Sequence, residues 1–377
     1  MPLFDPPLAF AASAVEFEMP SGMFQTWDGV VYLLTTGNGF LAYDLTKGSL
    51  LWKVPLINGP ARLGNTGPMI AEVDGKPTAF LTYRVVIEGS GTISDRTVMR
   101  VASFSLADGA VGWQTDVDDE RIPSDSGLGV DKVVAANSDH VVVSTDSHDT
   151  GGLGSDFTTV LDARTGKIRW SNPAFQARAL DGDTVAGMRS TDYRAKAERA
   201  TIGLAASDGA QRWIHENTRP SGVLGSGQLG GGLMQVYPVR GNSEGRPAGL
   251  IEIKTGREVI RFEPAGTATC RYDGEAVVVC AQHGGRSGET GSMAAYDATS
   301  YKLLWQLPDK AAGREAPKLS AARRGAIYGS TSNGPIILDA RTGQDKVTDL
   351  SFTPDVVIPG FGIVKSLKAI KVHAATG

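Results

Sequence analysis

The chain has 377 residues, of which 41% are hydrophobic, so it is long enough to bury a large core. A formal net charge of −4 at pH 7 gives no overall electrostatic reason to bind nucleic acid. The sequence contains no apolar run of the length that a membrane-spanning helix needs, and its start lacks the basic residues of a signal peptide.

The predicted strands come in pairs, beginning with a first repeat at residues 22–56. Alternating residues on either side of Asp28 and Gly29 predict one hairpin. Alternating residues around the turn at 44–48 predict a second hairpin, whose return strand contains Trp52. Asp supplies a side-chain acceptor for such a turn, and Gly tolerates the positive φ that it requires. Four strands in a repeat of this length are typical of a propeller blade.

The same unit recurs in order along the chain. Its second turn is found at residues 48, 109, 166, 209, 256, 301 and 343, and the second and third repeats cover residues 68–117 and 132–173. An apolar residue stands four places after each turn, and five of the six tryptophans occupy this position. The fixed position indicates packing between blades rather than a ladder of rings that stacks on a ligand.

The two ends of the chain together predict an eighth blade. Residues 356–364 form a further first hairpin, and residues 370–377 match residues 337–343 up to the turn. Residues 14–20 resemble the outer strand at 50–55 and supply the strand that the last blade lacks. We therefore predict an all-β, eight-bladed propeller of four-stranded antiparallel blades, with seven blades as the alternative.

This organisation predicts one domain over residues 1–377, which we expect to be a monomer. Because the chain begins and ends close to strands of one blade, we also expect that an upstream anchor or targeting segment has been trimmed.

The repeat resembles the PQQ-like quinoprotein repeat, whose phrase is a strand, Asp-Ala-x-Thr-Gly, and a strand with Trp. The copies at residues 162–170 and 339–343 carry this resemblance, which covers essentially the whole chain. Proteins with this repeat include quinoprotein alcohol dehydrogenases, BamB-type scaffolds of outer-membrane protein assembly, and sensor domains of bacterial kinases. The resemblance implies the fold but leaves the function open, because one propeller serves many unrelated roles.

Five consecutive blades have lengthened the connection between their second and third strands. In blades 2 to 6 these connections are residues 85–96, 145–156, 189–199, 238–246 and 282–291. The first is either a loop or a lengthened hairpin. All lie on the same rim as the links between blades, and surface loops on a rigid scaffold are frequent binding sites. Drift is the alternative explanation, because loops tolerate insertion at little cost.

Since the long loops are confined to adjacent blades, we favour a binding function for this face. Tyr and Arg are enriched at the centres of protein interfaces. We therefore predict that the contact residues include Tyr193, Arg194, Tyr237 and Arg240.

Acidic residues of blade 3 and of the link before it form one candidate calcium site. Asp118, Asp119, Asp146 and Asp149 offer the oxygen ligands that Ca²⁺ prefers, but they lack the spacing of an EF-hand. A solvated acidic rim is the simpler interpretation. The five histidines show no zinc-binding spacing. Apart from calcium at this patch, we expect no cofactor.

The only two cysteines, Cys270 and Cys280, flank a predicted turn at Asp273 and Gly274. If this turn joins neighbouring strands, the two side chains face each other, and we predict a disulfide. A disulfide favours a location outside the cytoplasm. The alternative is a pair of buried thiols.

We predict a non-catalytic, extracytoplasmic scaffold or sensor that binds a protein or a component of the cell envelope through the loop-rich face of blades 2 to 6. PQQ-dependent catalysis is disfavoured, because the resemblance to the dehydrogenases implies adjacent cysteines over the cofactor and the chain has no Cys-Cys pair. Nor is there a Gly-x-Ser-x-Gly nucleophile motif. Two alternatives stay open: a carbohydrate-active lyase or hydrolase with acidic residues at the channel mouth, and the sensor domain of a membrane kinase.

Overall fold

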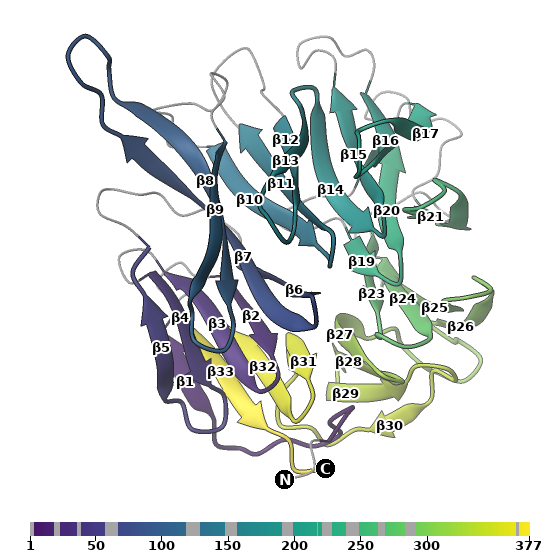
Figure 1. Cartoon of the computed structure of the whole chain (residues 1–377). Helices are drawn as coiled ribbons and strands as arrows, with labels where there is room; N and C mark the ends of the chain where they lie inside the picture. Colours follow the sequence, from purple (N-terminus) through teal and green to yellow (C-terminus); the bar gives the residue numbers. More distant parts are fainter. Residues whose placement is uncertain are drawn as a thin grey trace.

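The computed structural model describes residues 4–18, 23–35, 39–56, 67–117, 129–147, 157–190, 199–216, 218–220, 228–238, 249–262, 268–282, 291–366 and 369–377. Every regular element within these ranges is a β-strand, and the strands form eight separate antiparallel sheets. Figure 1 shows the sheets side by side around a ring, as the blades of a propeller. The predicted all-β, eight-bladed fold is confirmed. None of the described residues belongs to a helix long and apolar enough to cross a membrane.

Each blade is built from strands that follow one another in the chain, from the inner strand to the outer strand. Blade 1 consists of β2 (Met23–Trp27), β3 (Val30–Thr35), β4 (Gly39–Asp44) and β5 (Leu50–Val54), and blade 2 of β6 (Met69–Val73), β7 (Lys76–Ile87), β8 (Arg96–Ser105) and β9 (Val111–Val117). Blade 3 consists of β10 (Gly129–Ala136), β11 (His140–Ser147), β12 (Phe157–Asp162) and β13 (Ile168–Asn172). Blade 4 consists of β14 (Phe175–Asp181), β15 (Thr184–Ser190), β16 (Arg199–Ala205) and β17 (Gln211–Glu216).

Blade 5 has a divided inner strand. β18 (Thr218–Pro220) and β19 (Gln228–Gly230) both pair with β20 (Leu233–Pro238), which is followed by β21 (Gly249–Glu252) and β22 (Glu258–Arg261). Blades 6 and 7 return to four strands: β23 (Ala268–Tyr272), β24 (Val277–Gln282), β25 (Ser292–Asp297) and β26 (Leu303–Leu307); β27 (Lys318–Arg323), β28 (Ala326–Thr331), β29 (Gly334–Asp339) and β30 (Asp345–Val347).

Blade 8 is built from both ends of the chain. Its three inner strands are β31 (Val356–Ile358), β32 (Phe361–Lys365) and β33 (Ala369–Ala374), and β1 (Val15–Glu18) is the outer strand. β1 pairs with β33 from Val15 opposite Val372 to Glu18 opposite Ala369. This pairing closes the ring, so the predicted eighth blade is confirmed and the seven-bladed alternative is wrong.

Tryptophans join each of five blades to the next one. In blade 2, Trp113 donates its Nε1 hydrogen to the carbonyl oxygen of Ala163 in blade 3 at 2.9 Å. Equivalent bonds run from Trp52 to Leu106, from Trp170 to Ala206, from Trp213 to Ile253 and from Trp305 to Ala340. The turn glycine of the next blade lies against the indole, and a Cβ on Gly166 would stand 2.4 Å from the Trp113 ring. The prediction that these rings pack between blades is confirmed.

A carboxylate closes the turn that follows the third strand. Asp162 Oδ1 accepts the backbone N–H groups of Arg164 at 3.1 Å and Thr165 at 2.9 Å. Burial raises the pKa of Asp162, but these hydrogen bonds outweigh it and hold the pKa below its ordinary value. The same turn recurs at Asp44, Asp297 and Asp339. The repeated phrase in the sequence is thus a self-contained turn, and at Gly166 and Gly343 it also presents its glycine to a neighbouring indole.

The boundary between blades 7 and 8 is filled differently, because Val347 occupies the tryptophan position there. Phe10 packs into this boundary, with ring centroids 6.5 Å from Tyr328 and 5.3 Å from Phe352. The buried Tyr328 hydroxyl donates to the carbonyl oxygen of Pro7 at 2.7 Å. The segment before β1 therefore takes over the inter-blade contact that tryptophan makes elsewhere.

Candidate functional site

The strand order gives the ring two different rims. The turn rim carries the links between first and second strands and between third and fourth strands, which in blade 7 are residues 324–325 and 340–344. The loop rim carries the links between second and third strands and those between blades, which at blade 7 are residues 332–333 and 308–317. The long connection of blade 2 therefore belongs to the loop rim. In the predicted connections of blades 3 to 6, residues 148–156, 191–198, 239–246 and 283–290 lie outside the described residues.

The long connection of blade 2 is a lengthened hairpin, the second of the two predicted forms. β7 and β8 stay paired as far as Ile87 opposite Arg96. Figure 1 shows this hairpin, in blue, projecting past the neighbouring blades. Near its tip the Asp95 carboxylate accepts the Gly89 N–H at 2.9 Å. We call residues 85–97 the blade 2 arm.

The blade 2 arm carries exposed apolar side chains. Ile93 is 69% exposed and Val86 is 43% exposed. A single exposed apolar side chain is ordinary, but two on one projecting hairpin offer a partner apolar area without any rearrangement of the ring.

Two ion pairs fix the root of the arm, one on each of its strands. On β7, Arg84 Nε lies 2.6 Å from Asp131 Oδ2 of blade 3, and Arg84 Nη2 donates to Asp131 Oδ1 at 3.2 Å. Both side chains are buried. On β8, Arg100 makes the same two-pronged contact with Asp116 at 2.6 and 2.8 Å, near the surface. Paired bonds of this kind restrict the orientation of both partners, so the arm stands on a rigid base.

Sequence reasoning missed the pair of Arg84 and Asp131. The predicted repeats at residues 68–117 and 132–173 leave Asp131 between two blades, whereas it lies in β10, two residues after the strand begins. The alternation of residues along β7 and β10 marks strands but does not say which polar side chains meet across a blade boundary. The only signal is the presence of charged residues in two otherwise largely apolar strands.

Most of the predicted contact and metal residues lie outside the described residues. This holds for Tyr193, Arg194, Arg240, Asp118, Asp119 and Asp149. Asp146 lies on β11 opposite Val130, but its side chain is not described. Among the described residues there is no group of three or more His, Cys, Asp or Glu that could hold a metal ion. The calcium site and the enzyme that would use these acidic residues therefore stay predictions.

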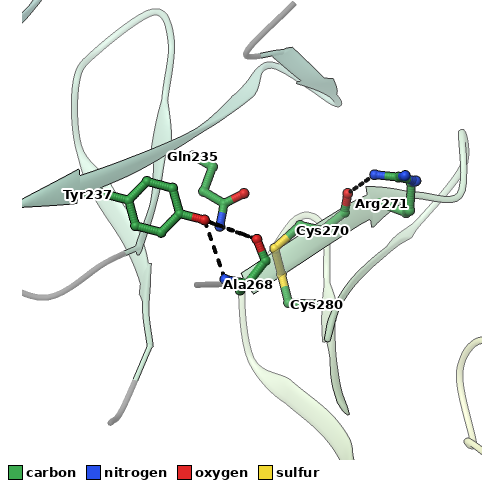
Figure 2. The surroundings of a disulfide bond; sticks show 6 residues. All are labelled: Gln235, Tyr237, Ala268, Cys270, Arg271 and Cys280. Carbon is green, nitrogen blue, oxygen red and sulfur yellow. Dashed lines mark hydrogen bonds between the residues drawn. A yellow bond between two sulfur atoms is a disulfide. The ribbon is translucent and has the colours of Figure 1, made fainter. Parts of the chain in front are cut away.

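Tyr237 lies on β20, where its hydroxyl joins blade 5 to blade 6. It donates to the carbonyl oxygen of Ala268 at 3.0 Å and receives a hydrogen bond from Gln235 Nε2 at 2.6 Å (Figure 2). The polar end of Tyr237 is thus engaged within the protein, and its ring is half-buried. Its predicted role as a contact residue stays a prediction.

Cys270 and Cys280 form the predicted disulfide. They stand directly opposite each other on β23 and β24, and both are buried (Figure 2). The alternative of two buried thiols is wrong. The two cysteines are separated by 10 positions in the sequence. They are therefore not the adjacent cysteine pair that the resemblance associates with a PQQ site. These residues do not fit that cofactor.

A pocket of about 530 Å³ lies beside blade 7 on the loop rim. It is open because β30 pairs with β29 only at Ile337 and Leu338, so that the first residues of β29 lack an outer neighbour. Its charged groups are already paired: Arg314 with Asp345, and Glu315 with the N–H and hydroxyl of Ser332. The repeat pattern in the sequence does not predict this pocket.

Comparison with known proteins supports a particular kind of propeller. A family model described as outer membrane protein assembly factor BamB matches residues 98–236, from β8 of blade 2 to β20 of blade 5. No curated protein sequence matches the chain. Among solved structures, BamB from Moraxella catarrhalis is 15% identical, covers 96% of this chain and 96% of its own, and has a TM-score of 0.50.

A quinohemoprotein alcohol dehydrogenase, ADHIIG from Pseudomonas putida HK5, is 13% identical and has a TM-score of 0.50. It covers 97% of this chain and 76% of its own length. At such low sequence identities the two structures support the fold alone. The repeat phrase, the closed ring of eight blades and the matched segment together support a PQQ-like, BamB-like β-propeller fold.

Proposed function

We propose that the chain is a protein-binding scaffold of the cell envelope that holds its partner on the loop rim, with the blade 2 arm as one of the docking elements. The observation that carries the proposal is the arm itself, which projects from the ring with Val86 and Ile93 exposed. The match to the BamB family model supports the scaffold role but not the arm's part in it, because the match begins at residue 98, just after the arm.

The rigidity of the arm and its exposed apolar side chains suit docking rather than catalysis. Binding is weakened when flexible segments must be ordered, and this arm is already ordered by its own ladder and by two ion pairs at its root. Apolar side chains at the tip would lose their contact with water in the complex, which stabilises association. The rest of the loop rim would add contacts around this anchor.

A location outside the cytoplasm is part of the proposal. The disulfide between Cys270 and Cys280 supports it, because structural disulfides persist in oxidising compartments. The BamB-like fold supports the same location by analogy.

The test is recovery of partners from detergent-solubilised envelope with two matched variants. One carries Val86→Ser and Ile93→Ser in the arm. The control carries Leu303→Ser and Leu304→Ser on the outer strand of blade 6, where the side chains are 53% and 37% exposed. We expect a defined partner to be retained by the wild type and by the control and to be lost from the arm variant. Equal retention of the partner by all three proteins would show that the arm does not bind it.

A further inference from the structure

The pocket of blade 7 exists because the outer strand of this blade stops early. β30 pairs with only part of β29. The backbone N–H of Asp339 in β29 faces β30, since it donates to the carbonyl oxygen of Gln344 at 2.8 Å. Backbone groups alternate in direction along a strand, so those of Pro335 face the same edge. Proline has no N–H to offer a fourth strand, and the chain leaves the sheet after Val347.

The pocket that remains, of about 530 Å³, has a lining of two kinds. Its apolar part comes from the core residues Leu307, Ile336 and Leu338. Its polar part comes from the two loop-rim links of blade 7, residues 308–317 and 332–333. A lining of this kind suits a side chain that has an apolar stem and a polar end.

Glu315 gives the polar part of the lining its charge. Its Oε1 accepts the hydroxyl of Ser332 at 2.8 Å and the N–H of Ser332 at 2.9 Å. These bonds, the hydroxyl first, hold the pKa of Glu315 below its ordinary value, so the group is ionised at neutral pH. Neither of these partners carries a charge, and among the described residues no cation forms an ion pair with Glu315. A carboxylate can accept further hydrogen bonds beyond these two.

The one cation of the lining is engaged on its other side. Arg314 Nη2 donates to Asp345 Oδ1 at 2.5 Å and to the carbonyl oxygen of Gly343 at 2.7 Å. Since Asp345 balances Arg314, the charge of Glu315 is left over among the lining residues. The pocket therefore presents an ionised acceptor beside an apolar surface, and a donor with a positive charge complements it.

We propose that this pocket binds the basic side chain, Lys or Arg, of an extended segment of a protein partner. The charged end would donate to Glu315, and the methylene stem would lie along the apolar lining. The carbonyl of Pro335 faces the vacated edge of β29, where it offers an acceptor to the backbone of an extended segment. The site is on a different blade from the blade 2 arm and does not depend on the proposed docking function of the arm.

The probes for the test are capped pentapeptides with four alanines around one central residue, which is lysine, arginine or norleucine. Norleucine keeps an apolar stem like that of lysine but lacks the ammonium group. Binding is followed through the NMR signals of the peptide as the full chain is added. We expect saturable binding of at least one of the two basic peptides. The norleucine peptide should bind about fivefold more weakly or worse, because it cannot donate to the carboxylate.

Glu315→Gln is the sharpest variant, because the amide oxygen still accepts the bonds from Ser332 while the charge is lost. It should weaken binding of the basic peptide about fivefold or more. Glu72→Gln makes the same change of net charge at an exposed position on β6 of blade 2 and should leave binding unchanged. Thr348→Trp introduces a large side chain at an exposed position that lines the pocket, and it should abolish binding of all three peptides.

Three results would overturn the proposal. These are no saturable binding of either basic peptide, equal binding of the norleucine and basic peptides, and binding that survives unchanged in Glu315→Gln or Thr348→Trp. The variant with Val86→Ser and Ile93→Ser in the blade 2 arm should bind the peptides as the wild type does. Failure of the arm and failure of this pocket are therefore distinguishable.

Discussion

Trp113 in blade 2 donates its indole N–H to the carbonyl oxygen of Ala163 in blade 3, and Gly166 of the same turn packs against the indole ring. Five such contacts hold consecutive blades together. The repeated phrase in the sequence therefore forms a contact between blades as well as a turn of the chain.

Substitution of the turn glycine should reveal this second role. Gly166 has φ +71°, and an added Cβ would meet the Trp113 ring at 2.4 Å. Gly29 has φ +74°, but an added Cβ there would meet nothing within 4 Å. We expect Gly29→Ala to lower the free energy of unfolding by about 1 kcal/mol, from backbone strain alone. Gly166→Ala should cost about 2 to 4 kcal/mol because overpacking is added. Equal losses on denaturant titration would contradict the inter-blade role.

The ion pair at the root of the blade 2 arm should matter more than its surface counterpart. Asp131→Asn leaves a buried arginine with its counter-charge removed, which we expect to cost about 3 kcal/mol or more. Asp116→Asn removes the partner of Arg100 near the surface and should cost about 1 kcal/mol or less. Denaturant unfolding of the two variants measures the difference. Similar values would mean that the root of the arm is held by its strands alone.

Acid should weaken the boundary between blades 5 and 6 through Glu252. Hydrogen bonding to Arg257 is the main cause that lowers the pKa of Glu252 to about 2 from an ordinary 4.5, with help from Thr255 and Tyr301 and against burial. Tyr301 lies in blade 6 and donates to Glu252 at 3.0 Å. A carboxyl group whose pKa is lowered by folding stabilises the fold above its unfolded pKa, and this contribution is lost as the pH falls toward the folded value.

The measurement compares the stability of wild type and Glu252→Gln between pH 7 and pH 2. We expect the wild type to be the more stable at neutral pH, and the difference to shrink as the pH falls from about 4.5 to about 2. Glu258→Gln, which changes an exposed partner of Arg261, serves as the control and should show a much smaller difference. A difference that does not change with pH would contradict the assignment.

The segment before β1 should contribute to ring closure through Phe10. This ring contacts Tyr328 and Phe352 where five other blade boundaries have tryptophan, and Gly362 leaves the space for it. Phe10→Ala should lower the free energy of unfolding by about 2 to 3 kcal/mol. Phe4 is 42% exposed, so Phe4→Ala should have little effect. Equal effects would show that the segment is not part of the closure.

The sequence predicted those features that repeat. The position of Trp170 after its turn, the phrase at Asp339 and the likeness between the two chain ends were enough for the blades, their number and their closure. The disulfide was also predictable, because Cys270 and Cys280 flank one short turn and therefore face each other.

Features that occur once were not predictable from the sequence. The contact of Arg84 with Asp131 joins different blades, and no period links two residues so placed. Phe10 fills a blade boundary more than 300 residues away in the chain, at Tyr328. Such pairs depend on the curvature of the whole ring, which local alternation does not encode.

The blade 2 arm is the proposed contact surface in the envelope, and site-specific photocrosslinking tests this role directly. A photoreactive residue would replace Ile93 at the tip of the arm, and in a separate protein it would replace Leu303 on the outer strand of blade 6; both positions are more than half exposed. We predict a discrete crosslinked protein from position 93 and none from position 303. No crosslink at position 93, or the same products from both positions, would contradict the account.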